Sequence, residues 1–451
     1  MKTYLGLAHG FHDAAMAVIE NDSIIYAGHS ERYSRIKNDK NISYHMPLWH
    51  WKCNLNTAFY ERPFLKNTRR LFAGQKWKSA PKYDHYIPHH WSHAAGGYYT
   101  RPWAAEPVCV VIDAIGEWDT CSIWYKKKKV WSKKYPYSLG LFYSAITQYI
   151  GLKPNEDEYI TMGMAAFGKH VFDLDYLLKY NLHKGIKEYV VGTNEDIAAA
   201  AQACIEKEII TIMTRARKYS DHLCYSGGVA LNCVANSKIH GMFKNIWIMP
   251  NPGDSGSALG AAATVNGNML EWNGPYLGHD IQRTIDPKQV VEHLIQHHYC
   301  GIANGRAEYG PRALGNRSLL ADPRGQEMKD KVNGIKQRQE FRPFAPVILE
   351  SDVHEYFNVN KGFSSPFMQQ VVRCKYPLKY PAIVHKDGTS RVQTVSEYSH
   401  PGLFALLTKW KKKTKCPMLL NTSLNIKGKP IVNDLQDAKD FQNKYGVEVV
   451  S

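Results

Sequence analysis

The sequence lacks the features of membrane-embedded and secreted chains. No run of about 18 apolar residues occurs in its 451 positions, so we expect no transmembrane helix. The opening segment, MKTYLGLAHGFHDAAM, has no long apolar stretch, and we expect neither a signal peptide nor a membrane anchor. The nine cysteines are odd in number and form no CxxC pair, which favours reduced thiols and a cytoplasmic location.

Two common catalytic signatures are also missing. The zinc-protease pattern HExxH is absent, because His90 stands where its general-base glutamate would be. The segment GMAAFGKH has the glycine spacing of a phosphate-binding P-loop, but His170 follows where a serine or threonine should bind Mg²⁺. We therefore expect neither type of enzyme.

The composition indicates a large globular protein of more than one domain. Hydrophobic residues make up 44% of the chain, which is longer than one typical domain. Apolar strand-like segments alternate with helix-like segments and glycine turns, which predicts an α/β fold. The Ala-rich, periodic segment 195–219 predicts a long helix, and segments 287–298 and 300–304 predict a helix and a short strand. The polar stretch EWNGPYLGHDI interrupts this pattern, and we place a boundary there, giving domains 1–275 and 276–451.

The charge balance predicts attraction to polyanions. The chain carries 57 lysines and arginines against 41 acidic residues, a net charge of +16. Basic residues concentrate with aromatic ones in segments 62–82, 125–135 and 409–415. These segments are either solvated loops or a surface that binds DNA or RNA, in which lysines contact phosphates and aromatic rings stack on bases.

A histidine-rich segment suggests a metal site. In IPHHWSHAAGGYY, His89 and His93 are four residues apart and share one face of the predicted helix. Asp113, at the end of a predicted buried strand, and Asp254, in a glycine-rich loop, are the acidic partners that we consider. Two histidines with two aspartates suit Fe(II), Mn(II) or Zn(II). The alternative is a set of polar residues on an exposed helix, and spacing alone does not show convergence.

Other segments have features of phosphate binding. The segment CYSGGVALN places Gly227 and Gly228 at a strand-to-helix turn, followed by Asn232, where backbone N–H groups bind a phosphate or simply form a tight turn. A dense basic segment follows the predicted boundary, with Arg306, Arg312, Arg317, Arg324, Lys336, Arg338 and Arg342. Arginine forks bind phosphate bidentately, so this density predicts a substrate with several phosphates. Polar side chains near the C-terminus add hydrogen-bonding groups for a nucleotide or acyl phosphate, namely Asn421, Thr422, Ser423 and Asn425.

Together these segments resemble the O-carbamoyltransferase family of the nodulation-factor, cephamycin and aminoglycoside type. The resemblance extends over nearly the whole chain and is most specific in AEYGPRALGNRSLLADPRG. Its other carriers include GFHDAA, HHWSHAA, IDAIGEWDT, MGMAAFG, SGGVALNCVAN, NPGDSGSALGAA, FRPFAP and NTSLN. It implies an N-terminal actin-like domain of the sugar-kinase and threonylcarbamoyl-transferase type and a C-terminal YrdC-like α/β domain.

The resemblance also implies a reaction and residue roles. The C-terminal domain is expected to make carbamoyl-adenylate from Mg-ATP and carbamoyl phosphate, with Arg312 and Lys336 catalytic. An iron site formed by His89, His93, Asp113 and Asp254 is expected to support transfer to an acceptor hydroxyl. His12 matches the histidine placed near that hydroxyl and is interpreted as a general base or, alternatively, a structural histidine, while Asp13 orients the loop or the acceptor.

The acceptor is left open by the sequence. The sequence departs from the family where a basic residue usually precedes the MGLA-like motif, which bears on the acceptor. The basic segments favour a hydroxymethylated nucleobase, such as 5-hydroxymethylcytosine in DNA, RNA or a nucleotide, over a sugar or antibiotic-like molecule. A threonylcarbamoyl-type reaction on tRNA and a non-catalytic nucleic-acid-binding module are the remaining alternatives, and a homodimer is one expected assembly.

Overall fold

The computed structural model describes residues 2–47, 55–339 and 342–451, and they divide into two compact units. Residues 1–30 and 40–272 make the first unit, and residues 31–39 and 273–451 make the second. The domains expected from the sequence, 1–275 and 276–451, place residues 31–39 in the first domain, whereas the structure groups these residues with the second unit. Cys53 and Phe341, which belong to features named above, lie outside the described residues.

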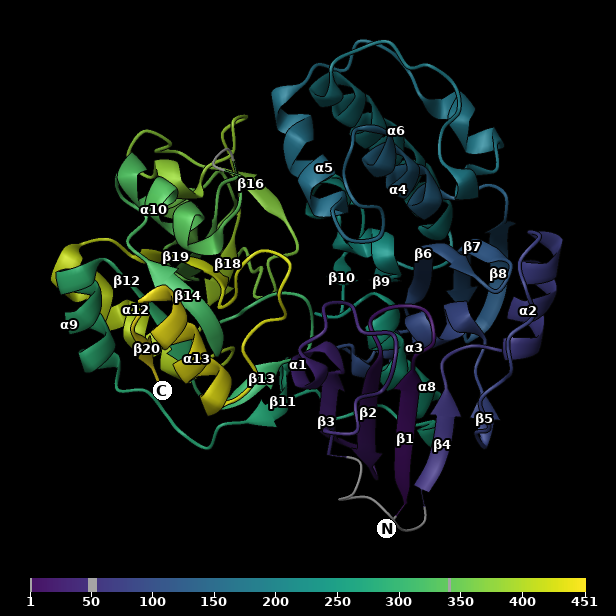
Figure 1. Cartoon of the computed structure of the whole chain (residues 1–451), viewed down its shortest axis with the longest axis horizontal. Helices are drawn as coiled ribbons and strands as arrows, with labels where there is room; N and C mark the ends of the chain where they lie inside the picture. The colour runs from purple at the N-terminus through teal and green to yellow at the C-terminus, as the bar shows by residue number, and fades with distance from the viewer. Residues whose placement is uncertain (1, 48–54, 340–341) are drawn as a thin grey trace. The chain divides into compact units, whose positions relative to one another are not determined.

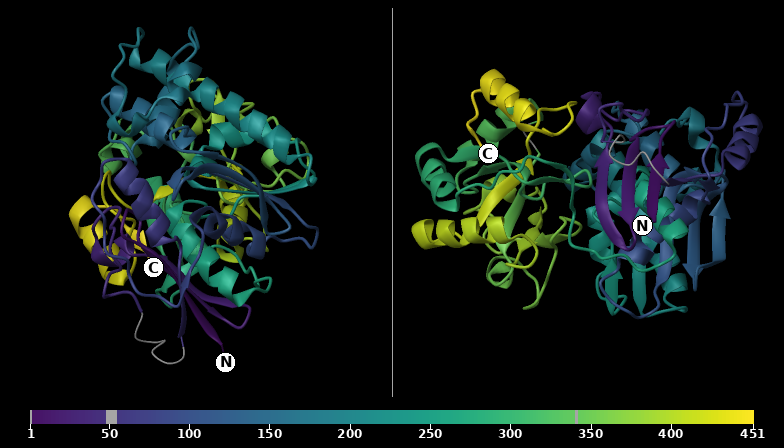
Figure 2. Two further views of the ribbon diagram at one scale, coloured as in Figure 1. Left: turned by 90° about the vertical axis from the view of Figure 1, so that its right-hand side faces the viewer. Right: turned by 90° about the horizontal axis from the view of Figure 1, so that it is seen from below.

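The first sheet of the first unit mixes antiparallel and parallel pairing. Its strands run in the order β3-β2-β1-β4-β5. The first three strands pair antiparallel in succession, and β4 and β5 then add parallel to β1. The strands are β1 Thr3–Ala8, β2 Ala15–Glu20, β3 Ser23–His29, β4 Leu55–Phe59 and β5 His85–Tyr86. In Figure 1 and the right-hand view of Figure 2, the purple strands β1–β3 lie side by side.

The second sheet of this unit repeats the topology of the first. Its order is β10-β9-β6-β7-β8, with β6, β7 and β8 antiparallel in succession and β9 and β10 added parallel to β6. The strands are β6 Val108–Gly116, β7 Asp119–Tyr125, β8 Lys128–Lys134, β9 His222–Ser226 and β10 Asn245–Trp247. Two sheets with this same topology are the arrangement expected for an actin-like domain, so the predicted fold of this region is confirmed.

Two helices pack together and connect these sheets. Helix α8, Ser257–Asn266, packs on β1 and β2, and helix α3, His89–Thr100, packs on β6 and β9. Every residue of α3 is buried. The helices approach closely because small residues line the contact: a Cβ on Gly260 of α8 would lie 1.7 Å from the carbonyl oxygen of Ser92 in α3. This close packing fixes α3 against the second sheet.

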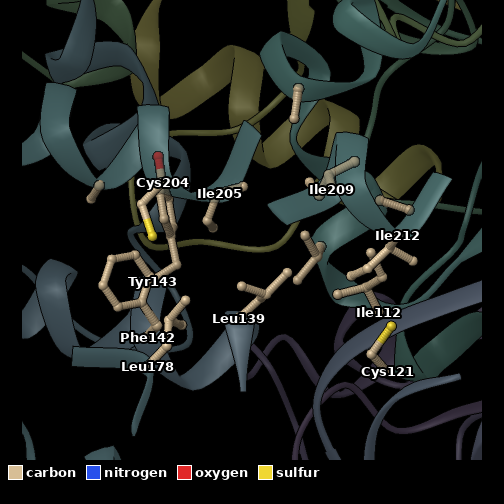
Figure 3. Close-up of a cluster of buried hydrophobic side chains, with 14 of the residues drawn as sticks. Ile112, Cys121, Leu139, Phe142, Tyr143, Leu178, Cys204, Ile205, Ile209 and Ile212 are labelled. Atoms are coloured by element: carbon tan, nitrogen blue, oxygen red, sulfur yellow. The ribbon is translucent and has the colours of Figure 1, made fainter. Parts of the chain in front are cut away.

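The remaining helices of the first unit cover the second sheet or lie at its margins. They are α2 Pro63–Phe72, α4 Leu139–Tyr149, α5 Glu158–Met164, α6 Asn194–Ala216 and α7 Cys233–Ile239. The long helix predicted around residues 195–219 is α6, which begins where the Thr193 hydroxyl accepts a hydrogen bond from the Asp196 N–H. Figure 3 shows side chains of α4 and α6 packed with Ile112 of β6 in the main core.

The second unit is an α/β structure with a core on both faces of one sheet. Its six strands are, in sheet order, β18 Gln393–Val395, β15 Ala345–Leu349, β19 Met418–Ser423, β14 Arg317–Ala321, β12 Tyr299–Ala303 and β20 Val449–Val450. Along β19, Leu419 packs in one core cluster, whereas Met418 and Leu420 pack in the other. This alternation follows the two-residue period of a strand that is covered on both faces.

Helices surround this sheet, and two short strand pairs accompany it. The helices are α1 Glu31–Ser34, α9 Pro287–His297, α10 Gln326–Lys336, α11 Val353–Tyr356, α12 Pro401–Thr414 and α13 Leu435–Tyr445. The pairs are β11 Tyr276–Asp280 with β13 Arg306–Glu308, and β16 Val371–Arg373 with β17 Thr389–Arg391. The helix and strand predicted after the boundary are α9 and β12.

The described helices and cysteines can be compared with what the sequence predicts about membrane spans and thiols. Over the described ranges, no helix is both long and apolar enough to cross a membrane. The eight cysteines in these ranges are free and buried.

Candidate metal centre and basic site

Four side chains from three parts of the first unit converge on one point. His89 and His93 come from the first turns of α3, Asp113 from β6, and Asp254 from the loop before α8. The two imidazole Nε2 atoms lie 3.1 Å apart, and each lies between 3.1 and 3.5 Å from a carboxylate oxygen of both aspartates. All four atoms lie within 4.8 Å of one another. The structure thus brings together the four residues that the sequence suggested separately.

The spacing of these atoms fits a divalent ion. Ligands about 2.1 Å from a metal lie about 3.0–3.4 Å from their neighbours in octahedral or tetrahedral coordination. Five of the six separations fall close to this range. Imidazole and carboxylate donors without a thiolate suit iron, manganese or zinc.

Without an ion, the cluster concentrates charge in a buried place. Burial opposes a charge on His93, but hydrogen bonds and attraction from Asp113 and Asp254 outweigh it and raise the pKa to about 10. Burial also opposes the charge of Asp113, yet His89 and His93 hold the pKa of that carboxyl well below its usual value. The cluster therefore needs positive charge between its carboxylates, which a proton or a metal ion can supply.

The backbone around the cluster orients its ligands. The Pro252 carbonyl oxygen lies 3.1 Å from Nδ1 of His93, and because a carbonyl only accepts, Nδ1 carries the proton and Nε2 faces the centre. Nδ1 of His90 lies 2.7 Å from the hydroxyl oxygen of Ser122, and His90 is not part of the cluster. A Cβ on Gly116 would lie 2.2 Å from the His89 ring, so only glycine allows β6 to pass this close.

The glycine turn predicted to bind phosphate contacts the cluster. The Gly228 N–H donates to Oδ1 of Asp113 at 3.2 Å. Gly227 has φ of 94°, and its Cβ would lie 2.1 Å from the Ile112 carbonyl. Asn232 caps helix α7 and forms a buried amide pair with Gln202. In this structure Gly228 orients a candidate metal ligand and Asn232 stabilises the fold, and phosphate binding by this turn stays a prediction.

One buried carboxylate near the cluster escaped the sequence analysis. Glu61 is 5% exposed, and its Oε2 lies 3.9 Å from Nδ1 of His89, which has no hydrogen-bond partner among the described residues. Lys66 holds both oxygens of Glu61, at 2.7 and 2.8 Å. Glu61 follows β4, a strand parallel to β1, and the carboxyl ends of parallel strands collect ligand groups, which is the signal that would have found it.

His12 lies at the edge of the cluster, on the loop between β1 and β2. Its Nε2 is 4.0 Å from Oδ2 of Asp254, and its Nδ1 is 3.0 Å from Oδ2 of Asp13. Burial opposes its charge, but Asp13, Asp254 and Asp113 outweigh it and raise the pKa to about 9. The side chain is 30% exposed, so His12 can contact both the cluster and an arriving molecule.

A second polar site forms in the second unit, at the end of α10. The ammonium group of Lys336 donates to the backbone carbonyl and the hydroxyl of Ser423 and to Oδ1 of Asn425. Burial and the positive charges of Arg338 and Arg342 hold the pKa of Lys336 well below its usual value. Those are the charges that act on it, so an anion would complement this site. Thr422 precedes Ser423 on β19 and is half-buried.

Several other predicted phosphate ligands have structural partners. Arg317 is fully buried and directs its five N–H groups to the backbone carbonyls of Asn433, Asn304, Asn316, His279 and Gly305. Since no donor remains for a phosphate, that prediction for Arg317 is corrected. Arg306 donates to the carbonyls of Leu277 and Gly278, and the buried Asn421 amide donates to Ala313 and Gln393. Arg312 is half-buried in the same segment.

A buried glutamate organises the arginine-rich segment. Oε1 of Glu308 accepts hydrogen bonds from the N–H groups of Leu314, Asn316 and Arg317. Its Oε2 is buried and accepts no hydrogen bond from the described residues. The segment GPRALGNRS is therefore held in shape by the glutamate two residues before its first glycine.

The basic segments predicted from the sequence lie in three places. Segment 62–82 comprises α2 and the loop that follows it, 125–135 covers the hairpin of β7 and β8, and 409–415 ends α12. The first of these is the continuation of the loop that carries Glu61, and its exposed side chains include Phe64 and Trp77.

Comparisons with known proteins give a consistent result. A family model described as carbamoyltransferase N-terminus matches residues 54–185 and 174–263, and one described as carbamoyltransferase C-terminus matches 291–451. The chain is 30% identical to uncharacterized protein sll1178 of Synechocystis sp., over 97% of this chain and 94% of that one. It is 36% identical to nodulation protein NolO of Bradyrhizobium diazoefficiens, over 67% and 65%. It is 35% identical to nodulation protein U of Azorhizobium caulinodans, of which it spans 48%.

Proposed function

Because the chain belongs to the carbamoyltransferase family, we propose that it is an ATP-dependent enzyme that transfers a carbamoyl group to an acceptor hydroxyl through carbamoyl-adenylate. The observation that carries this proposal is the convergence of four ligand atoms beside His12, with a separate anion-complementing site around Lys336. Each site suits one half of such a reaction.

The first half-reaction is proposed for the site around Lys336. Carbamoyl phosphate, ATP and one water give carbamoyl-adenylate, pyrophosphate and inorganic phosphate. Water would first split the anhydride bond of carbamoyl phosphate, which gives carbamate and inorganic phosphate. A carbamate oxygen would then bond to the α-phosphorus of ATP while the bond from that phosphorus to pyrophosphate breaks. Arg338 and Arg342 would neutralise the phosphate oxygens, and Lys336, whose three N–H groups are held by Ser423 and Asn425, would act through its positive charge. Arg312 is proposed to assist in this step.

The second half-reaction is proposed for the cluster in the first unit. A divalent ion there, Fe(II) in our proposal, would polarise the carbamoyl carbonyl as a Lewis acid and offset the carboxylate charges beside His12. His89, His93, Asp113 and Asp254 would hold it. His12 would take the proton of the acceptor hydroxyl as its oxygen bonds to the carbamoyl carbon, and AMP would leave with the other oxygen. Asp13 keeps the His12 ring in place through Nδ1.

For the acceptor we propose a hydroxymethylated nucleobase, such as 5-hydroxymethylcytosine in DNA, RNA or a nucleotide. The support is the net charge of +16 and the basic, aromatic segment 62–82, which continues from the loop beside the cluster. A neutral sugar gives no reason for such a surface, whereas a phosphate backbone does. A sugar or antibiotic-like acceptor is the second candidate, because the chain resembles carbamoyltransferases of the nodulation-factor, cephamycin and aminoglycoside type and is similar to nodulation proteins.

The test is mass spectrometry of acceptors after incubation with ATP, carbamoyl phosphate and Fe(II). The acceptors are DNA containing 5-hydroxymethylcytosine, its free nucleotide, an aminoglycoside and a simple sugar, and AMP is measured in parallel. A carbamoyl mass gain on DNA or the nucleotide supports the full proposal. A carbamoyl mass gain on the sugar or aminoglycoside alone would replace the nucleobase by a sugar or antibiotic-like acceptor in the proposal. If no AMP forms with any acceptor, the enzymatic proposal is contradicted and a nucleic-acid-binding module is favoured.

A further inference from the structure

A continuous line of contacts connects the metal-ligand cluster to an exposed basic and aromatic surface. His12 lies 4.0 Å from Asp254, and the Phe11 ring lies beside the His12 ring with centroids 4.6 Å apart. The Lys66 ammonium lies 5.6 Å from the centroid of Phe11. Phe11 is 53% exposed, so an aromatic face is open to solvent directly beside the proposed general base.

The line continues onto helix α2 and the loop after it. Lys66 is on α2. The pKa of Lys78 is lowered by burial and by the nearby positive charges of Arg70, Lys66 and Lys40. Glu61 is the acid that acts on Lys78 there, and Lys66 already binds both of its oxygens. The surface therefore has an excess of positive charge. We name Phe11, Phe64, Lys66, Arg70, Lys76, Trp77 and Lys78 the basic–aromatic strip, in which Lys76 is exposed beside Trp77.

Exposed rings lie among these cations. Phe64 is 66% exposed and Trp77 is 50% exposed, with ring centroids 5.9 Å apart. Large aromatic side chains that remain open on the surface beside cations are typical of interaction sites. Each ring leaves a face on which a planar group can stack.

The loop that carries Trp77 is held in place before any partner binds. The Asn67 side chain donates to the Lys78 carbonyl at 2.7 Å and accepts from the Lys78 N–H at 3.1 Å. The Arg70 side chain donates to the Lys76 carbonyl at 3.0 Å. A surface fixed in this way loses little conformational entropy when it binds.

We propose that the basic–aromatic strip binds a single-stranded nucleic acid and guides one of its bases to His12. The phosphates would contact Lys66, Arg70 and Lys78, and bases would stack on Phe64, Trp77 and Phe11. A single strand is required because bases inside a duplex present no free face and cannot reach a buried cluster without leaving the stack. This inference rests on the proposed carbamoyl transfer to a nucleobase and assigns its acceptor a surface.

The experiment measures binding of a labelled, mixed-sequence 20-mer of single-stranded DNA to the full chain, with inorganic polyphosphate as a ring-free polyanion. The double variant Phe64→Ala, Trp77→Ala removes the rings, and Lys76→Ala, Lys78→Ala removes two charges. The matched charge control is Lys439→Ala, Lys444→Ala on α13, which also removes two exposed lysines and lies outside the three basic segments.

We expect removal of the rings to weaken DNA binding at least about tenfold and to leave polyphosphate binding unchanged. Removal of the Lys76 and Lys78 charges should weaken both and make the salt dependence shallower, by about 0.7 in log–log slope for each phosphate that is no longer neutralised. The α13 control should change DNA binding less than twofold. Equal DNA binding by the ring variant and the unmodified chain, or an equally large effect in the α13 control, would overturn the inference.

Failure here is distinguishable from failure of the proposed function. AMP formation from ATP and carbamoyl phosphate, and carbamoylation of the free nucleotide, do not need the strip. If both reactions occur while the ring variant binds DNA as the unmodified chain does, the proposed role of the strip is wrong and the proposed enzymatic function is retained. If neither reaction occurs in the unmodified chain, the proposed function itself is wrong.

Discussion

The backbone N–H of Gly228 donates to Oδ1 of Asp113 at 3.2 Å, so a glycine turn holds a carboxylate of the candidate metal centre. A Cβ on Gly228 would lie 3.0 Å from the same oxygen. Glycine at this position therefore gives Asp113 both a hydrogen-bond donor and the room to face His89 and His93. This relationship explains the glycine turn without a phosphate.

The first prediction follows from that contact. Gly228→Ala should displace the Asp113 carboxylate and weaken Fe(II) or Zn(II) binding about tenfold, measured by competition with a chelating dye. Gly334→Ala is the control, because no heavy atom lies within 4 Å of the Cβ it adds. Unchanged affinity in Gly228→Ala would show that the carboxylate does not need this turn.

Glu61 is expected to position His89. Its carboxylate lies 3.9 Å from Nδ1 of His89, and a metal ion on Nε2 would favour a hydrogen bond from Nδ1 to this acceptor. Glu61→Gln should lower the affinity for a divalent ion about 10- to 100-fold, measured by calorimetric titration. His93→Ala should abolish binding at the same concentrations. If Glu61→Gln binds metal as the unmodified chain does, Glu61 has another role.

His12 is expected to act only in transfer. His12→Gln should keep adenylate formation, seen as pyrophosphate release from ATP in the presence of carbamoyl phosphate, and lower carbamoyl transfer at least about 100-fold. His45→Gln, an exposed histidine, serves as the matched substitution. Pyrophosphate release reports adenylate formation, and mass spectrometry of the acceptor reports transfer, so both steps are measured in one reaction. An equal drop in both for His12→Gln would show that the division of labour is wrong.

Lys336 predicts a pH dependence of nucleotide binding. Burial and the nearby Arg338 and Arg342 hold its pKa well below 10.5, so the charge that would bind phosphate disappears as pH rises through the folded-state pKa. ATP affinity should fall with pH in that window, by up to about tenfold per unit. Lys336→Met should bind ATP weakly at every pH and show no such slope in calorimetric titrations. A slope that persists in Lys336→Met belongs to another group.

Lys336 should affect the free energy of unfolding in the opposite direction, so that stability increases where ATP affinity decreases. Between the depressed folded-state pKa and 10.5, the unfolded chain binds more protons at Lys336 than the folded chain does. The free energy of unfolding should therefore rise with pH across that window, through this residue. In Lys336→Met the free energy of unfolding should differ less between two pH values in this window than in the unmodified chain, as measured by denaturant titration.

Arg317 is expected to act on stability. All five of its N–H groups bind backbone carbonyls, and lysine has only three donors in a different geometry. Arg317→Lys should lower the free energy of unfolding by about 3 kcal/mol or more, measured by denaturant titration. Arg324→Lys is the control, because that side chain is bound to Asp322 and is more exposed. A stable Arg317→Lys that no longer binds ATP would restore the phosphate-binding interpretation.

The sequence by itself determined the α/β class, the long helix α6 and the candidate ligands His89 and His93. These depend on local periodicity: an apolar alternation, a 3.6-residue repeat and two histidines four residues apart are readable along the chain. The charge of segment 62–82 was equally visible, because it is a matter of composition.

Only the tertiary structure decided which polar groups meet. Asp113 and Asp254 reach the histidines because two sheets pack on α3 and α8, and Glu61 joins them from a strand parallel to β1. The same folding directs the N–H groups of Arg317 to backbone carbonyls and the N–H of Gly228 to the Asp113 carboxylate. Hydrogen-bond partners distant in sequence are selected by packing, and no local pattern encodes them.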